Sequence, residues 1–304
     1  MRTILFVKTS SLGDVVHNCP AVSDAARALP GVAIDWVVEE PFAGIAAMHR
    51  SVRRVFPVAV RLWRSTLFKR PTWSEISAFR RQLAAERYDA VVDTQSLLKS
   101  ALLAKLATGA RHGMDRASAR EPLAALFYDV RHTVPRGLHA VERNRLLTGA
   151  ALQFTVDQAP DYGLRIPRAE KSGYFVLLTM TSRADKLWPE ERWIELGRAL
   201  GAPAILPWGS AEELARAERI SAAIGGTVLP RRSLEELSKL FAGARAVVGL
   251  DTGLTHLAVA LGVRTVGIYC GSDPQRTGLY GPSASNLGGP GAPPRAEEVL
   301  RLIA

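Results

Sequence analysis

Residues 251–256, Asp-Thr-Gly-Leu-Thr-His, place a carboxylate, two hydroxyls and an imidazole around one glycine. The small and β-branched residues at 246–250 indicate a preceding strand, and the apolar residues that follow recur at the spacing of an amphipathic helix. The first turn of such a helix leaves backbone N–H groups without intrahelical partners, at the positive end of the helix dipole. The sequence therefore predicts a phosphate site here; an ordinary strand-to-helix connection is the alternative.

A second turn of the same plan lies near the start of the chain. A strand predicted at 3–8 leads through a polar loop to Gly13 and Asp14, and a helix follows as far as Ala28. Both turns place a carboxylate where a strand gives way to a helix. On the local sequence alone, Asp14 is better explained as a helix N-cap than as a catalytic base.

Strands alternate with helices through both halves of the chain. The first half has predicted strands at 32–38 and 89–93 and helical patterns at 74–87 and 97–107. The second half has predicted strands at 174–178, 204–207, 226–229 and 263–269, helices at 190–200, 211–223, 233–242 and 295–303, and a loop-rich stretch at 271–294. This alternation favours an α/β fold with two doubly wound, Rossmann-like domains.

A polar, turn-rich stretch at about 150–172 separates the two halves, so we expect domains at 1–160 and 161–304. Doubly wound domains bind ligands at the carboxyl ends of their strands. We therefore expect the turns at 9–14 and 251–256 to face each other across a cleft between the domains. One turn can hold an anionic donor while the other carries a base.

The composition, 47% hydrophobic and 22% charged over 304 residues, is that of a soluble globular protein. The net charge of +10 favours an anionic partner, which could be nucleic acid, an acidic membrane surface or a phosphorylated substrate.

The two cysteines, Cys19 and Cys270, fit neither a disulfide framework nor a zinc site. No signal-peptide core or membrane-spanning run is recognisable, so any membrane contact is expected to be peripheral. No nicotinamide fingerprint or Walker loop appears.

The stretch 41–74 contains no acidic residue and seven cations. The aromatic residues Trp63, Phe68 and Trp73 are interleaved with these cations. We interpret the stretch as a loop that lies on an anionic lipid surface or closes over an acidic acceptor, because guanidinium groups bind phosphate and carboxylate in bidentate fashion. Contact with single-stranded nucleic acid is one alternative, and a solvated loop whose tryptophans pack into the core is another.

Three spaced motifs carry a family resemblance that runs in order along nearly the whole chain. They are Ser10-Ser11-Leu12-Gly13-Asp14, Thr181-Ser182-Arg183-Ala184-Asp185-Lys186-Leu187-Trp188-Pro189 and Asp251-Thr252-Gly253-Leu254-Thr255-His256. Together they resemble glycosyltransferase family 9, the lipopolysaccharide heptosyltransferases, and within it most closely the members that act on Kdo-lipid A. The resemblance implies a two-domain GT-B fold. It also implies inverting transfer of L-glycero-D-manno-heptose from ADP-heptose to the Kdo of Kdo-lipid A.

The resemblance also implies roles for individual residues. Asp14 would be the general base, and Lys186, with Thr181 and Ser182, would contact the diphosphate and stabilise the leaving group. Thr252, Gly253 and Leu254 would offer backbone N–H groups to the phosphates, with His256 nearby and Asp251 orienting the turn. The segment 207–212 matches the nucleotide segment of the family, so Glu212 is the candidate for the ribose hydroxyls, although Glu213 adjoins it.

Acceptor recognition is assigned to cations of the first domain that could pair with the Kdo carboxylate and the lipid A phosphates. The candidates are Arg61, Arg64, Lys99, Arg116, Arg120 and Arg143. Since no Asp-x-Asp or other carboxylate cluster appears, we expect no obligatory metal or other cofactor. The expected location is cytoplasmic, peripheral on the anionic inner face of the cytoplasmic membrane, with no nucleic-acid partner. Transfer to an existing heptose, or non-catalytic binding of a nucleotide sugar or nucleic acid, are the alternatives.

Overall fold

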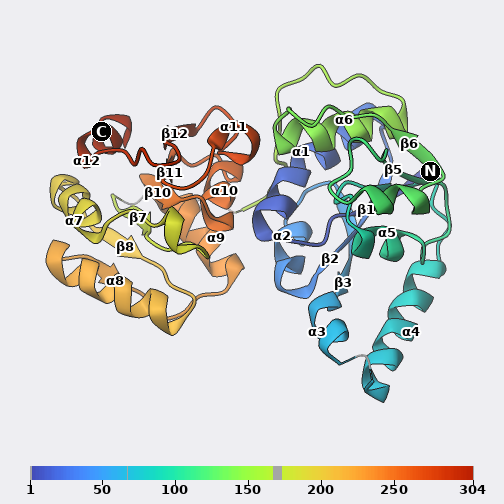
Figure 1. Cartoon of the computed structure of the whole chain (residues 1–304), viewed down its shortest axis with the longest axis horizontal. Helices are drawn as coiled ribbons and strands as arrows, with labels where there is room; N and C mark the ends of the chain where they lie inside the picture. Colours follow the sequence, from blue (N-terminus) through green and yellow to red (C-terminus); the bar gives the residue numbers. More distant parts are fainter. Residues whose placement is uncertain (1, 67, 167–172, 304) are drawn as a thin grey trace. The chain divides into compact units, whose positions relative to one another are not determined.

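The computed structural model describes residues 2–66, 68–166 and 173–303. The chain forms two compact units, Met1–Leu164 and Arg165–Ala304, which are described separately. The part of the expected interdomain linker at 167–172 lies outside the described residues. Each unit consists of a parallel six-stranded sheet with helices (Figure 1).

The sheet of the first unit has the strand order β3-β2-β1-β4-β5-β6, and all neighbouring strands run parallel. Its strands are β1 (Thr3–Val7), β2 (Ala33–Glu39), β3 (Val52–Val58), β4 (Ala90–Asp93), β5 (Arg111–Met114) and β6 (Val130–His132). The central strands β1, β2 and β4 are buried along their whole length, as a sheet covered on both faces requires.

The helices of the first unit are α1 (Leu12–Ala28), α2 (Ala43–Ala47), α3 (Val60–Ser65), α4 (Arg70–Ala84), α5 (Leu98–Ala104) and α6 (Ala140–Leu152), with short 3-10 turns η1 (Glu40–Phe42) and η2 (Pro122–Phe127). Helix α1 packs against α6. Figure 1 shows α3 and α4 extending beyond the strands at one end of this unit.

The sheet of the second unit has the order β12-β11-β10-β7-β8-β9. Its strands are β7 (Phe175–Leu178), β8 (Ala204–Leu206), β9 (Thr227–Val228), β10 (Ala246–Leu250), β11 (Thr265–Tyr269) and β12 (Ala284–Gly288). Its helices are α7 (Glu190–Ala199), α8 (Ala211–Ile224), α9 (Leu234–Gly243), α10 (Gly253–Ala260), α11 (Pro274–Thr277) and α12 (Ala296–Ile303), with the 3-10 turn η3 (Ala184–Lys186).

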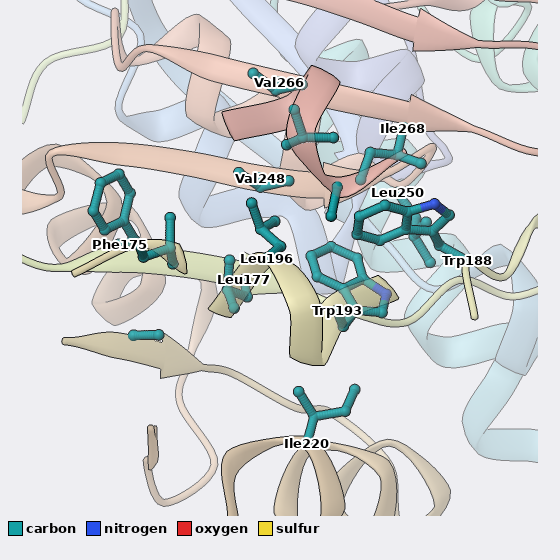
Figure 2. Packing of buried hydrophobic residues seen from close by; sticks show 14 of the residues in the cluster. Phe175, Leu177, Trp188, Trp193, Leu196, Ile220, Val248, Leu250, Val266 and Ile268 are labelled. Carbon is teal, nitrogen blue, oxygen red and sulfur yellow. The ribbon is translucent and has the colours of Figure 1, made fainter. Parts of the chain in front are cut away.

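The core of the second unit is built around two fully buried tryptophans (Figure 2). Trp188 and Trp193 pack edge to face, with ring centroids 4.9 Å apart, beside the side chains of β7, β10 and β11. The indole N–H of Trp188 donates to the Pro294 carbonyl at 2.9 Å. Trp188 therefore packs in the core and anchors the end of the segment that carries Lys186.

The expectation of a loop over 41–74 is wrong. This stretch contains α2, β3, α3 and the start of α4. The strand was missed because Arg53 and Arg54 interrupt its apolar pattern. Both arginines reach the buried carboxylate of Asp35, each at 2.8 Å, so these cations neutralise an internal charge. Arg50 likewise pairs with Asp161.

The loop-rich interpretation of 271–294 is also incomplete, because α11 and β12 lie within it. Strand β12 has the sequence Ala-Ser-Asn-Leu-Gly and forms the edge of its sheet, partly exposed. An edge strand of this kind lacks the apolar run by which a buried strand is recognised.

Candidate functional site

In the first unit, the residues that follow β1 form a tight turn into α1. Ser11 is the N-cap of α1, and Asp14 occupies the third helical position, where its Oδ2 accepts the Ser11 N–H at 3.1 Å. The interpretation of Asp14 as the N-cap itself is therefore wrong: it completes a capping box. The amide of Gln95, just after β4, holds the turn by accepting the N–H groups of Thr9 and Ser10.

Two cations flank the Asp14 carboxylate from other elements. Arg120 Nη1 lies 3.2 Å from Asp14 Oδ2, and half of the Arg120 side chain is exposed. Lys99 Nζ donates to Ser10 Oγ at 2.8 Å. Beneath the turn, burial lowers the pKa of Lys8 to about 8, although Asp14 opposes this shift. At the carboxyl edge of this sheet, the Asp14 carboxylate therefore lies among positively charged side chains.

The remaining expected acceptor cations differ in their surroundings. Arg61 and Arg64 are exposed on α3, and Arg116 is exposed just beyond β5. Burial lowers the pKa of Lys99, and the charges of Arg61 and Arg64 lower it further, so both arginines lie close enough to act on this lysine. Glu39 and Asp14 act in the opposite direction. Arg143 is half-buried and donates to the Ser118 carbonyl at 2.6 Å, so its guanidinium is partly used within the fold.

Three polar side chains at the same sheet edge were not identified from the sequence. Glu39 Oε1, Thr9 Oγ1 and Ser96 Oγ are buried and have no hydrogen-bond partner among the described residues. Burial raises the pKa of Glu39, while Lys99 and Arg61 act in the opposite direction. An unpaired buried polar group is costly, so a hydrogen-bonding partner at this edge of the sheet would stabilise these three oxygens. The sequence did hold one indication of these residues: Glu39 ends β2, and Thr9 and Ser96 lie just beyond β1 and β4, where doubly wound sheets bind ligands.

In the second unit, Asp251 follows β10 and is held by three partners. Its Oδ2 accepts from Lys186 Nζ at 2.6 Å and from Ser272 Oγ at 2.8 Å, and its Oδ1 lies 3.7 Å from His256 Nε2. Burial alone would raise the pKa of Asp251, but His256, Lys186 and Ser272 outweigh it and hold this pKa well below its usual range. Asp251 is therefore a fixed anion that positions Lys186 and His256.

Thr252 is the N-cap of α10, so the N–H groups of Gly253 and Leu254 occupy the first helical turn as predicted. Helix α10 packs very close to its strand. A Cβ atom at Gly249 would lie 2.4 Å from Thr255 Oγ1, which donates to the Leu250 carbonyl at 2.6 Å. The fully buried Thr255 hydroxyl thus fixes the turn rather than facing a ligand.

The segment that follows β7 contacts Asp251 and so lies at the same turn. Thr181 Oγ1 donates to the Asp251 carbonyl at 3.3 Å, and Ser182 is exposed beside it. Lys186 lies in η3, and only 18% of its side chain is exposed, so it is not merely a solvated lysine. The structure therefore brings Thr181, Lys186, Asp251 and the start of α10 together.

At the carboxyl end of the neighbouring β8, the two glutamates have different surroundings. Glu213 Oε2 accepts the Gly209 N–H at 2.6 Å, whereas Glu212 is exposed in the first turn of α8. Glu212 is therefore the carboxylate left accessible for a hydroxyl ligand. Among the described residues, no three His, Cys, Asp or Glu side chains gather as a metal site would require.

The comparisons with known proteins agree on the family. Residues 76–299 match glycosyltransferase family 9 (heptosyltransferase). The chain is 46% identical over 289 residues to lipopolysaccharide heptosyltransferase 1 of Salmonella typhimurium, covering 91% of each chain. It is 47% identical over 295 residues to the protein of the same name from Pseudomonas aeruginosa, covering 94% of this chain and 83% of that one.

The solved structure of E. coli heptosyltransferase WaaC with ADP superposes with a TM-score of 0.93 at 43% identity, covering 99% of this chain and 98% of that chain. The E. coli ADP-heptose LPS heptosyltransferase II gives a TM-score of 0.80 at 20% identity, with 99% and 97% covered, which supports the fold alone. Two doubly wound parallel sheets, the site geometry and these relatives lead to one conclusion. The chain belongs to glycosyltransferase family 9, the heptosyltransferases, and is a glycosyltransferase with the GT-B fold.

Proposed function

We propose that this chain transfers L-glycero-D-manno-heptose from ADP-heptose to the Kdo of Kdo-lipid A, with inversion at the anomeric carbon, in lipopolysaccharide inner-core synthesis. The relatives named lipopolysaccharide heptosyltransferase 1 and the structural neighbour with ADP support this proposal. The observation that carries it is the chemistry of the two sheet edges. One presents a carboxylate beside cations, and the other a lysine beside a helix start.

The first unit, with the edge around Asp14, is assigned to the acceptor. In the transfer, the acceptor hydroxyl oxygen bonds to the anomeric carbon on the face opposite the leaving group, and its proton passes to the Asp14 carboxylate. Arg120 pairs with this carboxylate. The anionic acceptor competes for the guanidinium of Arg120, because arginine pairs strongly with carboxylates and phosphates. Acceptor binding thereby frees Asp14 to act as the base.

The second unit is assigned to the donor. As the bond between the anomeric carbon and the diphosphate oxygen breaks, its electron pair remains on ADP and negative charge accumulates there. Lys186 and the N–H groups of Gly253 and Leu254 stabilise that charge in fixed positions. Thr181 and Ser182 add hydroxyls, and Glu212 accepts from the ribose hydroxyls. These groups carry the electrostatic part of catalysis, and we propose that no metal ion is obligatory.

We further propose that the protein works at the anionic inner face of the cytoplasmic membrane, as a peripheral protein. None of the described helices has the length and apolar character needed to cross a bilayer. Leu62 in α3 and Trp73 in α4 are more than half exposed, and Phe68 between these helices is fully exposed, beside Lys69 and Arg70. Apolar side chains interleaved with cations suit a lipid interface.

The test is ADP release from ADP-heptose in the presence of Kdo-lipid A. We expect the Asp14→Asn variant to lose a factor of roughly 10² to 10⁴ in kcat, the usual contribution of a general base, while ADP binding is unchanged. Asparagine retains an oxygen that can accept the Ser11 N–H. Asp157→Asn, at an exposed carboxylate, is the matched control and should be fully active.

Full activity of the Asp14→Asn variant would remove Asp14 from the mechanism. An assay with a second acceptor, one that already bears a heptose, distinguishes transfer to Kdo from transfer to an existing heptose. Turnover with only that acceptor would reassign the substrate. Affinity for DNA or RNA that falls steeply with salt, without any ADP release, would instead indicate a nucleic-acid-binding protein.

A further inference from the structure

One charged residue of the first unit is enclosed in the protein and has no role in the mechanism proposed above. Lys8 follows β1 and is only 4% exposed. Its Nζ donates to the Thr94 carbonyl at 2.9 Å and to Asn144 Oδ1 at 3.4 Å. None of the described carboxylates forms an ion pair with it. A buried ammonium held only by neutral groups is costly, so the fold retains this charge at the expense of stability.

The two groups that accept from this ammonium are themselves bonded to α1. Asn144, from α6, donates through Nδ2 to the His17 carbonyl at 3.0 Å. Thr94, just beyond β4, donates through Oγ1 to Asn18 Oδ1 at 2.7 Å. His17 and Asn18 lie about one helical turn after Asp14 along α1. The ammonium is therefore fixed beside the helix whose first turn carries Asp14.

The charges around Lys8 come from several elements. Burial lowers the pKa of Lys8 to about 8, so this lysine still carries its charge at pH 7. Asp14 is the largest of the charges that act on it, and it opposes the effect of burial. Since such an interaction is mutual, Lys8 acts on Asp14 as a nearby positive charge. The other ionisable groups of the surrounding elements are Arg120, Asp93, Arg143 and the paired imidazoles of His17 and His139.

The Asp14 carboxylate needs such a charge most when the acceptor is bound. In the transfer proposed above, the anionic acceptor competes for Arg120 and covers the carboxylate from water. Loss of hydration and a neighbouring anion both favour the protonated carboxyl, which cannot accept a proton from the acceptor hydroxyl. An anionic ligand cannot draw Lys8 away in the same manner, because Lys8 is enclosed in the fold.

We propose that Lys8 is a positioning residue whose buried charge keeps Asp14 ionised while the anionic acceptor is bound. It acts through Asp14 and touches neither substrate. This inference rests on the function proposed above. A charge enclosed in the fold is screened much less than an exposed one, so a single lysine suffices without a direct ion pair.

The test is the pH dependence of the single-turnover rate with ADP-heptose and detergent-dispersed Kdo-lipid A both saturating, so that the rate reports the bound state. Lys8→Gln keeps an N–H donor for the Thr94 carbonyl but removes the charge. We expect its acidic limb to move upward by about one pH unit, so that the rate on that limb falls about tenfold and recovers at higher pH. ADP binding should match the wild type.

Two changes at Asn144 separate the charge of Lys8 from its packing. Asn144→Asp keeps the lysine but places a carboxylate beside it, which offsets its charge, so the acidic limb should again move upward. Asn144→Ala removes the same side-chain contacts and keeps the charge, so the limb should stay at the wild-type pH. Lys105→Gln, at an exposed lysine of the same unit, is the matched control and should follow the wild type throughout.

An acidic limb at the wild-type pH in Lys8→Gln, whatever the overall loss of rate, would show that Lys8 only supports the fold and would overturn the proposal. If that variant does not fold, Asn144→Asp decides in the same way. Equal shifts in Asn144→Asp and Asn144→Ala would also overturn it, because packing rather than charge would then be the cause. A wild type that releases no ADP with Kdo-lipid A, or a fully active Asp14→Asn variant, would instead show that the proposed function or its base is wrong.

Discussion

Lys186 and Asp251 form an ion pair whose side chains are 18% and 12% exposed, with their charged atoms 2.6 Å apart. A flexible lysine loses side-chain entropy when it is fixed, so a carboxylate that fixes it in advance removes that cost from the binding of ADP. Asp251 is itself fixed by Ser272 and lies close to His256. At this scale, the proposed donor site consists of a positioned cation, Lys186, and the groups that position it.

We expect Lys186→Met to weaken ADP binding and to lower kcat by a factor of roughly 10² to 10³, the usual effect of removing one preorganised donor from a site of developing charge. The acceptor KM should not change, because the lysine belongs to the donor unit. Isothermal titration with ADP and steady-state ADP release measure the two effects. Lys239→Met removes an exposed lysine from the same unit and should match the wild type. An unchanged ADP affinity in Lys186→Met would contradict the assignment.

At the residue scale, the sequence yields candidates where the groups lie within short motifs. The turn at 251–256 and Asp14 could be proposed from sequence because the groups that shape each turn are neighbours along the chain, and their roles stay predictions. The pairing of Arg120 with Asp14 could not be foreseen, since 106 residues separate the two. The unpartnered Oε1 of Glu39 could not be predicted either, because only the fold determines which groups surround a buried oxygen.

At the scale of elements, the buried strands and the amphipathic helices of the second unit could be read from periodicity alone. Strand β3 could not be recognised because Arg53 and Arg54 interrupt its apolar pattern. Their charges are paired with Asp35 from the adjacent strand and with Glu86. Helix α6 was not predicted. It carries the buried polar residues Asn144 and Arg145 on the side that packs in the fold, so its apolar face is interrupted. Hydrophobic periodicity does not show which polar side chains pair with each other in the folded protein, so elements that contain such pairs are missed.

His49 links α2 to β3 and gives this region a pH dependence. Its Nδ1 accepts the Ser51 N–H at 3.2 Å, and its Nε2 lies 3.2 Å from the Cys19 carbonyl and 3.1 Å from Ser23 Oγ. This arrangement requires the neutral ring with its proton on Nε2, because protonation of Nδ1 would direct two N–H groups at each other. Burial lowers the pKa of His49 to about 4.

Between about pH 6.5 and pH 4, the unfolded state therefore binds a proton that the folded state does not, so stability falls as the pH is lowered through this window. Relative to His49→Gln, we expect the wild type to lose about 3 kcal/mol more unfolding free energy between pH 7 and pH 4. Urea unfolding at a series of pH values measures this difference. Identical pH profiles for the two proteins would show that His49 is not the titrating group.

At the scale of the whole molecule, charge is distributed unequally between the two units. Residues 1–164 contain 22 of the 39 cations and 15 of the 29 acidic residues, so the first unit carries +7 of the net charge of +10. This is the unit to which we assign the anionic acceptor. The same unit has the exposed apolar side chains of α3 and the following segment. In the peripheral binding that we propose, charge attracts the unit to an anionic surface and the apolar side chains then hold it there.

We expect the protein to bind vesicles that contain phosphatidylglycerol and to bind neutral phosphatidylcholine vesicles far more weakly. Phe68→Ser should weaken binding to the anionic vesicles roughly tenfold, because moving a phenylalanine side chain out of water is worth about 1.5–3 kcal/mol when the transfer is complete. Raising the salt from 0.1 M to about 0.5 M should weaken it further, since exposed charges are screened. Leu123→Ser, at a leucine that is 56% exposed on η2, serves as the matched control in sedimentation with vesicles. Binding that is indifferent to salt and to Phe68 would show that the positive first unit serves the acceptor alone, and that the enzyme meets its lipid substrate without resting on the membrane.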